Sequence, residues 1–262
     1  MARADLHLSS YRFLVTLSGS VRIMQDEVRT AAAFYTGSAG ERTVHLLGPY
    51  LTQRWPDLKG QRLLGLGFAA PYLPLWDGQT ALSVSARLDS ATQCEAGRMQ
   101  YCRECVVSGR QLPFDDLSFD RVLMIHALET SHAGHELLRA VWKVLRDDGR
   151  LLLVVPNRRG VWAFSDTTPF GQGTPFSQRQ LRVRLEQSMF HVENSRTGLY
   201  PPPFPRLGGR RAGEAIEKAG RSVLPTFGGA VIVEAVKNIW GGLPLLTAKS
   251  CRPVGRRIFE TG

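Results

Sequence analysis

The chain has 262 residues, of which 43% are hydrophobic and 21% charged, and its formal net charge is +10. This composition is typical of a globular protein, and the length suffices to bury a large core without disulfides. No apolar run approaches the ~20 residues that cross a bilayer, so we expect no membrane span.

The cysteines favour a reduced, cytoplasmic protein. They are too few and too irregularly spaced for a disulfide framework, and the single Cys-x-x-Cys pair lacks the second pair of a zinc finger. We therefore expect no metal. The four are Cys94, Cys102, Cys105 and Cys251.

The two ends of the chain differ from its middle. Residues 1–26 are rich in Arg and Ser, and their apolar stretch is too short for a secretory signal. We expect a flexible leader or a misplaced start there, with a transit peptide as the alternative. The main domain is expected over residues 27–240 and a basic tail over 241–262.

Positive charge is concentrated late in the chain. Residues 196–262 hold eleven Lys and Arg against four Asp and Glu. Such a segment suits phosphates or an anionic surface, although a solvated basic face is commoner.

Hydrophobic spacing predicts alternating strands and helices. Apolar side chains at intervals of three and four predict a helix over 41–55, which Pro56 ends. A later helix is expected over 132–149, ended by Gly149, and another over 177–190 with a capping box at Ser177. The predicted strands are 61–67, 80–88, 101–107, 120–128, 150–157 and 228–240.

This order predicts βαβ units, hence an α/β fold with a doubly wound parallel sheet and helices on both faces. Ligands of such sheets bind at the carboxyl ends of the strands. Four prolines in 200–209 exclude a helix or central strand there.

One stretch resembles a known family. "LPFDDLSFDRVLMIHALE" followed by "LLRAVWKVLRDDGRLLLVVPN" is similar to the centre of class I S-adenosylmethionine-dependent methyltransferases of the type 11 sort. The segments "HALE", "PNRRGVWA" and "TPFGQGTPFS" resemble a narrower bacterial branch of that family. The resemblance covers roughly residues 27 to 240. It implies a mostly parallel seven-stranded Rossmann-like sheet whose last strand is antiparallel, with "HVENSRTGL" and "AVIVEAVKNI" as the closing pair. It also implies methyl transfer from S-adenosylmethionine to a small-molecule acceptor.

The cofactor motif of that family is degenerate here. Its first strand ends in acid-x-Gly-x-Gly-x-Gly, whereas this chain places Gly65 where the acid stands, then Gly67, Ala69 and Pro71, with Phe68 between. The turn can form if Ala69 keeps a negative φ and Pro71 opens the next helix. It lacks the carboxylate that holds the cofactor's ammonium.

The resemblance implies further cofactor contacts at the next two strand ends. The ribose-binding acid has only Asp89 as a candidate, and Ser108 replaces an Asp that receives the adenine amino group; Gln111 and Leu112 follow in the same loop. A hydroxyl accepts that bond more weakly than a carboxylate.

For chemistry we single out His126 and Glu129, after the fourth strand. His126 would orient or deprotonate the acceptor, or else cap the strand end, and Glu129 would assist it or cap the next helix. The proposed acceptor contacts are Asn157, Arg158 and Arg159, which could clamp an anionic group, and Phe170 in a lid-like loop. The Phe34–Tyr35 pair would cover the cofactor or pack in the core.

Two alternatives stay open. A catalytically silent relative would use the damaged pocket as a binding or regulatory surface. An RNA methyltransferase would use the basic C-terminal region for its nucleic acid.

Overall fold

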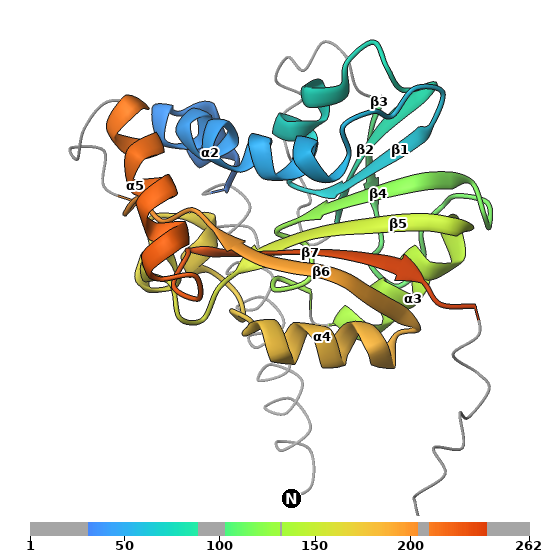
Figure 1. Ribbon diagram of the computed structural model, residues 1–262. Helices are drawn as coiled ribbons and strands as arrows, with labels where there is room; N and C mark the ends of the chain where they lie inside the picture. Colours follow the sequence, from blue (N-terminus) through green and yellow to red (C-terminus); the bar gives the residue numbers. More distant parts are fainter. Residues whose placement is uncertain (1–30, 89–102, 132, 204–209, 240–262) are drawn as a thin grey trace, which may run out of the picture.

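The computed structural model describes residues 31–88, 103–131, 133–203 and 210–239. They form a seven-stranded sheet in the order β3-β2-β1-β4-β5-β7-β6 (Figure 1). The strands are β1 (Arg62–Gly67), β2 (Leu82–Leu88), β3 (Arg103–Val107), β4 (Phe119–Ile125), β5 (Leu145–Pro156), β6 (Phe190–Gly198) and β7 (Ala230–Lys237). β1 to β5 are parallel, and β7 runs antiparallel to both β5 and β6. The predicted Rossmann-like methyltransferase fold is confirmed.

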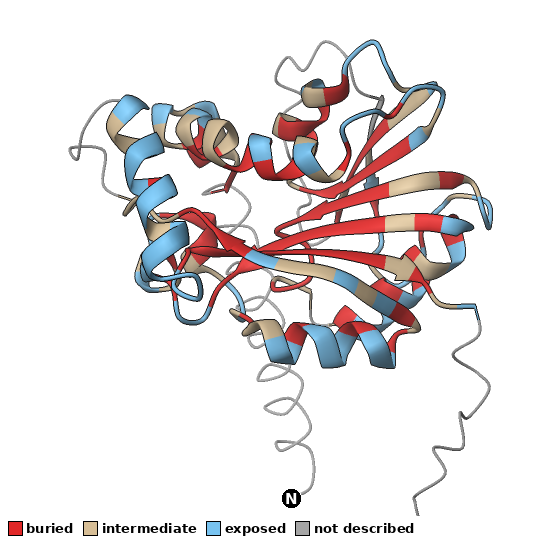
Figure 2. Ribbon diagram, viewed as in Figure 1, coloured by how far each residue is buried: buried red, intermediate tan, exposed pale blue. Residues whose placement is uncertain are grey.

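The central strands are buried on both faces, as their continuous apolar runs predict. Alternate side chains enter different cores: Leu123 and Ile125 of β4 face one, and Val122 and Met124 face the other. Figure 2 shows this buried band crossing the sheet. Each fully buried aliphatic side chain contributes about 1.5–3 kcal/mol to folding.

Helices cover both faces of the sheet. The first core packs under α2 (Ser38–Arg54) and the 3₁₀ segments η1 (Ala70–Trp76), η3 (Val161–Phe164) and η4 (Pro169–Gly171). The second packs under α3 (Gly134–Val144) and α4 (Gln178–Gln187). α5 (Arg210–Val223) lies against α2 and β6 (Figure 1).

Three local predictions need correction or completion. The helix expected over 132–149 ends at Val144, since β5 already begins at Leu145 and Gly149 lies inside that strand. The segment after β1 is a 3₁₀ helix, because Pro71 and Pro74 remove N–H donors. The sequence analysis missed α5. The capping box at Ser177 is confirmed in both directions.

Among the described residues, no helix is both long and apolar enough to cross a membrane. The same part of the chain contains no group of three His, Cys, Asp or Glu side chains arranged to hold a metal ion.

Candidate active site

The turn after β1 brings the chain against the end of β4. Gly67 has φ +77°, and a side chain there would overlap the carbonyl of Ile125, so only glycine fits. The Phe68 N–H donates to that same carbonyl at 2.7 Å. Ala69 has φ −77°, as the turn requires of a residue with a side chain. The degenerate motif therefore still forms a tight turn.

Position 65, where the family carries its acid, has neither a charge nor room for a side chain. A Cβ built on Gly65 would lie 3.0 Å from the Ala69 Cβ and 3.0 Å from Leu73 Cδ2. Both neighbours are buried, so even a Cβ at position 65 would force one of them to shift, and a carboxylate would need more room still. Sequence reasoning identified the missing acid but not the side chains that fill its place.

His126 follows directly after β4, in the left-handed conformation with φ +50°. This unusual backbone directs a buried imidazole across the strand end. Its Nδ1 lies 2.9 Å from Glu129 Oε1, and both side chains are almost wholly buried. The other carboxylate oxygen, Glu129 Oε2, is buried without a hydrogen-bond partner in the described residues. The structure thus brings the two predicted catalytic residues together.

Tyr35 completes a hydrogen-bonded series that the sequence analysis did not assemble. Its hydroxyl lies 2.9 Å from His126 Nε2 and 3.2 Å from the hydroxyl of Tyr72, which η1 supplies. Burial, followed by the neighbouring Tyr72, raises the pKa of Tyr35 well above its ordinary value. Tyr35 is therefore a neutral phenol at physiological pH. Four side chains from three separate elements form this series.

The loop after β5 forms one wall of the site. The ring centroid of Phe170 lies 4.5 Å from that of His126 and 5.2 Å from that of Trp162, and Phe34 contacts Trp162 in turn. The Thr174 N–H donates to the Glu129 carbonyl at 3.0 Å. The predicted lid-like loop is thus packed on the His126–Glu129 pair.

At the next two strand ends the structure describes only part of the predicted cofactor contacts. Asp89 lies outside the described residues. At the end of β2, Arg87 places its guanidinium 6.0 Å from the ring centroid of Phe68, so a cation stands close to this turn. Ser108 is exposed, and its hydroxyl accepts from the Arg110 N–H at 3.3 Å.

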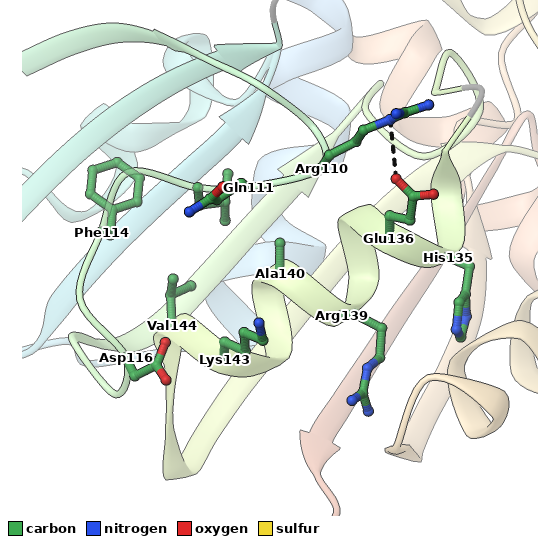
Figure 3. A pocket seen from close by; sticks show the side chains of 11 residues that line it. Arg110, Gln111, Phe114, Asp116, His135, Glu136, Arg139, Ala140, Lys143 and Val144 are labelled. Atoms are coloured by element: carbon green, nitrogen blue, oxygen red, sulfur yellow. Dashed lines mark ion pairs between the residues drawn. The ribbon is translucent and has the colours of Figure 1, made fainter.

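Gln111 and Leu112 border a groove on the flank of α3 (Figure 3). The exposed pair Arg110–Glu136, 3.2 Å apart, crosses one end of it. In this groove the side chain of Gln111 faces α3, whereas the side chain of Leu112 is buried.

The three residues after β5 behave differently from one another. Asn157 is buried, and its amide donates to the carbonyls of Thr226 and Gly228 at 2.9 and 2.6 Å. It therefore ties this loop to the turn before β7. Arg158 and Arg159 are exposed at the same edge of the sheet.

The fold and this strand-end site define a class I methyltransferase domain. A family model described as "Methyltransferase domain" matches residues 64–153, which span β1 to β5. Residues 64–153 therefore match a methyltransferase domain, as the sequence motifs predict. S-adenosylmethionine is the methyl donor of that class.

Solved structures share this fold at low sequence identity. A methyltransferase of Haloferax volcanii, in complex with the Trm112 methyltransferase activator, is 18% identical with TM-score 0.58, covering 82% of this chain and 97% of its own. A Thermotoga maritima protein, described as a possible histamine N-methyltransferase, is 15% identical with TM-score 0.55, covering 82% and 100%. An S-adenosylmethionine-dependent methyltransferase of Mesorhizobium loti is 14% identical with TM-score 0.51, covering 77% and 99%. No curated protein matches the chain.

Proposed function

We propose that this protein transfers the methyl group of S-adenosylmethionine to a small molecule whose nucleophilic atom carries a proton, such as a hydroxyl. One observation carries the proposal: the buried pair Glu129 and His126 and the half-buried Tyr35 form a hydrogen-bonded series at the strand end where the family binds its ligands. A proton relay is useful only for an acceptor that must lose a proton.

Two features fit the donor. The turn at Gly67 brings backbone close to the site, and Phe68 offers an aromatic side chain beside it. The unsatisfied Glu129 Oε2 offers buried negative charge near a site that must hold a cationic ligand. Gly67, Phe68 and Glu129 would therefore hold the cofactor, together with the predicted loop residue Ser108. When bound, S-adenosylmethionine supplies an electrophilic methyl group.

The hydrogen bonds of this series all run in the same direction, each donor pointing from Tyr72 toward Glu129. If the Glu129 carboxylate accepts the Nδ1–H of His126, then Nε2 carries a lone pair and accepts the hydroxyl of Tyr35. Tyr72 then donates to the Tyr35 oxygen, which keeps room for one further donor. An acceptor hydroxyl can fill that position.

Proton movement follows this direction. As the acceptor loses its proton to the Tyr35 oxygen, the phenolic proton of Tyr35 moves to His126 Nε2. The adjacent Glu129 carboxylate stabilises the imidazolium that forms. Because the pKa of Tyr35 is raised by burial, its phenol passes a proton rather than resting as a phenolate.

Arg158 and Arg159 extend the site toward solvent. They are exposed at the end of β5, where guanidinium groups can bind a carboxylate or phosphate. We infer an acceptor that carries such a group, and a cytoplasmic protein, since irregularly spaced cysteines suit a reducing compartment.

The decisive experiment is calorimetry with S-adenosylmethionine and its demethylated product, followed by tritium transfer from the labelled donor to a panel of phenols, alcohols and thiols. The proposal expects donor binding, and label transfer that His126→Asn abolishes. Absence of heat and of any thermal shift at millimolar ligand would contradict it.

A second candidate is a non-enzymatic binding or regulatory protein. The filled space at Gly65 favours it, because Leu73 and Ala69 crowd the position where the family carries its acid. The Trm112 complex of the Haloferax relative suggests a protein as the kind of partner. This candidate predicts no donor binding in the same calorimetric experiment.

A further inference from the structure

Large apolar side chains are exposed on two segments at one end of the molecule. Phe164 of η3 is 80% exposed and Val223 at the end of α5 is 74% exposed. We call the group the apolar rim; it comprises Val161, Phe164, Val223, Leu224 and Phe227. Exposed side chains of this size and number on two short segments indicate a contact surface rather than scattered surface residues.

The two segments lie side by side. The side-chain amide of Asn157 donates hydrogen bonds to the carbonyls of Thr226 and Gly228. A side chain on Gly160 would overlap the backbone of Gly228 and Gly229. η3 therefore begins where the turn after α5 ends. Figure 1 shows that turn and the loop after β5 at the same end of the sheet.

Exposed cations stand on the helix and the loop that carry the rim. Arg158 and Arg159 precede η3, and Arg211 and Lys218 stand on α5. Arg221 lies over the Tyr50 ring at 4.6 Å, and Arg210 pairs with the exposed Glu214. Asp166 is the acid that follows Phe164. Cations outnumber acids here, in line with the basic C-terminal quarter of the chain.

We propose that the apolar rim docks on an anionic lipid bilayer. Basic residues next to exposed apolar ones are the pattern of proteins that lie on membrane surfaces: the apolar groups enter the interface, and the cations meet lipid phosphates. Lipid fits better than nucleic acid, because valine and leucine gain nothing from phosphates and do not stack on bases. It fits better than an acidic protein because the apolar groups protrude from a short 3₁₀ segment and from the turn after α5.

The rim is also the outer wall of the candidate site. Trp162 is buried against Phe170 and Phe34, while its neighbours Val161 and Phe164 face outward. A docked protein would therefore present the carboxyl edge of its sheet to the bilayer. Docking itself requires no methyl transfer, so its test is independent of the proposed function.

Co-sedimentation of the full chain tests the proposal, using vesicles of phosphatidylcholine with and without phosphatidylglycerol. We expect binding that requires phosphatidylglycerol and weakens as salt rises. Phe164→Ser combined with Phe227→Ser is expected to lower the partition coefficient at least tenfold. Arg211→Gln with Lys218→Gln is expected to lower it about fivefold per charge. Val183→Ser, an exposed position on α4, is the matched control and should bind as the parent does.

Two outcomes would overturn the proposal. One is no binding to phosphatidylglycerol vesicles at low salt. The other is binding that the serine pair does not change, which would place the contact elsewhere. Phe164→Leu keeps an apolar side chain and should bind normally, which separates lost insertion from lost folding. Salt-sensitive retention on RNA with no vesicle binding would assign the basic surface to nucleic acid instead.

Discussion

Gly65→Asp restores the acid that this family normally carries, and the structure predicts that it harms the protein. The new Cβ would lie 3.0 Å from the Ala69 Cβ and from Leu73 Cδ2, and 3.1 Å from Leu73 Cδ1. Gly65 lies in β1, whose neighbours in the sheet are also buried. The carboxylate would enter an apolar space that has no described cation to pair with it.

The expected cost follows from two terms. Forcing extra atoms into a packed core costs about 1–3 kcal/mol. A buried polar group without a partner adds about 1–3 kcal/mol, and more when it is charged. Gly65→Asp should therefore lower the free energy of unfolding by roughly 3 kcal/mol or more. Gly65→Ala, which adds only the Cβ, should show the packing term alone.

Urea unfolding at pH 7 measures these costs, and calorimetry with S-adenosylmethionine measures the ligand. Adding Leu73→Ala opens the space, so the double variant should lose less stability than the two single variants together. If Gly65→Asp alone folds as stably as the parent and binds the donor more tightly, the space is not filled as described. The reasoning about the site would then fail.

Four further variants test other parts of the structure. Tyr35→Phe should lower kcat about 10²–10⁴-fold with little change in Tm, because it removes the hydroxyl next to His126. Tyr72→Phe removes only the outer hydroxyl and should lower kcat far less. Equal losses of kcat in the two variants would contradict the relay. Ser177→Ala should cost about 1 kcal/mol in urea unfolding, because the α4 capping box loses its acceptor, and an unchanged midpoint would refute this. Burial opposes ionisation of Asp120, but hydrogen bonds from the Arg62 N–H and from Arg146 lower its pKa overall. The ionised Asp120 therefore stabilises the folded state above about pH 4, and this contribution is lost as pH falls through the lowered pKa. Asp120→Asn should accordingly lower the free energy of unfolding more at pH 6 than at pH 3, as urea unfolding at the two pH values would measure.

The fold was predictable because its signals are local and repeated. β4 and β5 contain continuous apolar runs over 122–125 and 151–155, and α4 begins at a capping box that the sequence alone reveals. α5 was missed because its apolar side chains are few and exposed, so no buried stripe marks it. The end of α3 was misplaced because Gly149 suggested a helix stop, whereas the chain turns directly into β5 at Leu145.

The site was predictable only in part, because its key contacts join distant segments. His126 and Glu129 are three residues apart, so their pairing follows from one strand end. Tyr35 reaches His126 across 91 positions of sequence, and no local pattern shows that contact. Nor does any motif show that Leu73 fills the space beside Gly65, since this depends on how the 3₁₀ turn packs on β1.

The contacts of Glu129 also determine where the site carries its negative charge. The family places an acid at the end of β1, but here that end is apolar and the buried carboxylate belongs to Glu129, beyond β4. A carboxylate that both supports His126 and faces a cationic ligand would link the two events, because binding the cation weakens its hold on an imidazolium. Glu129→Gln should therefore weaken donor binding and lower turnover together. If only turnover falls, Glu129 serves the histidine alone, and the donor's charge must be met by another residue.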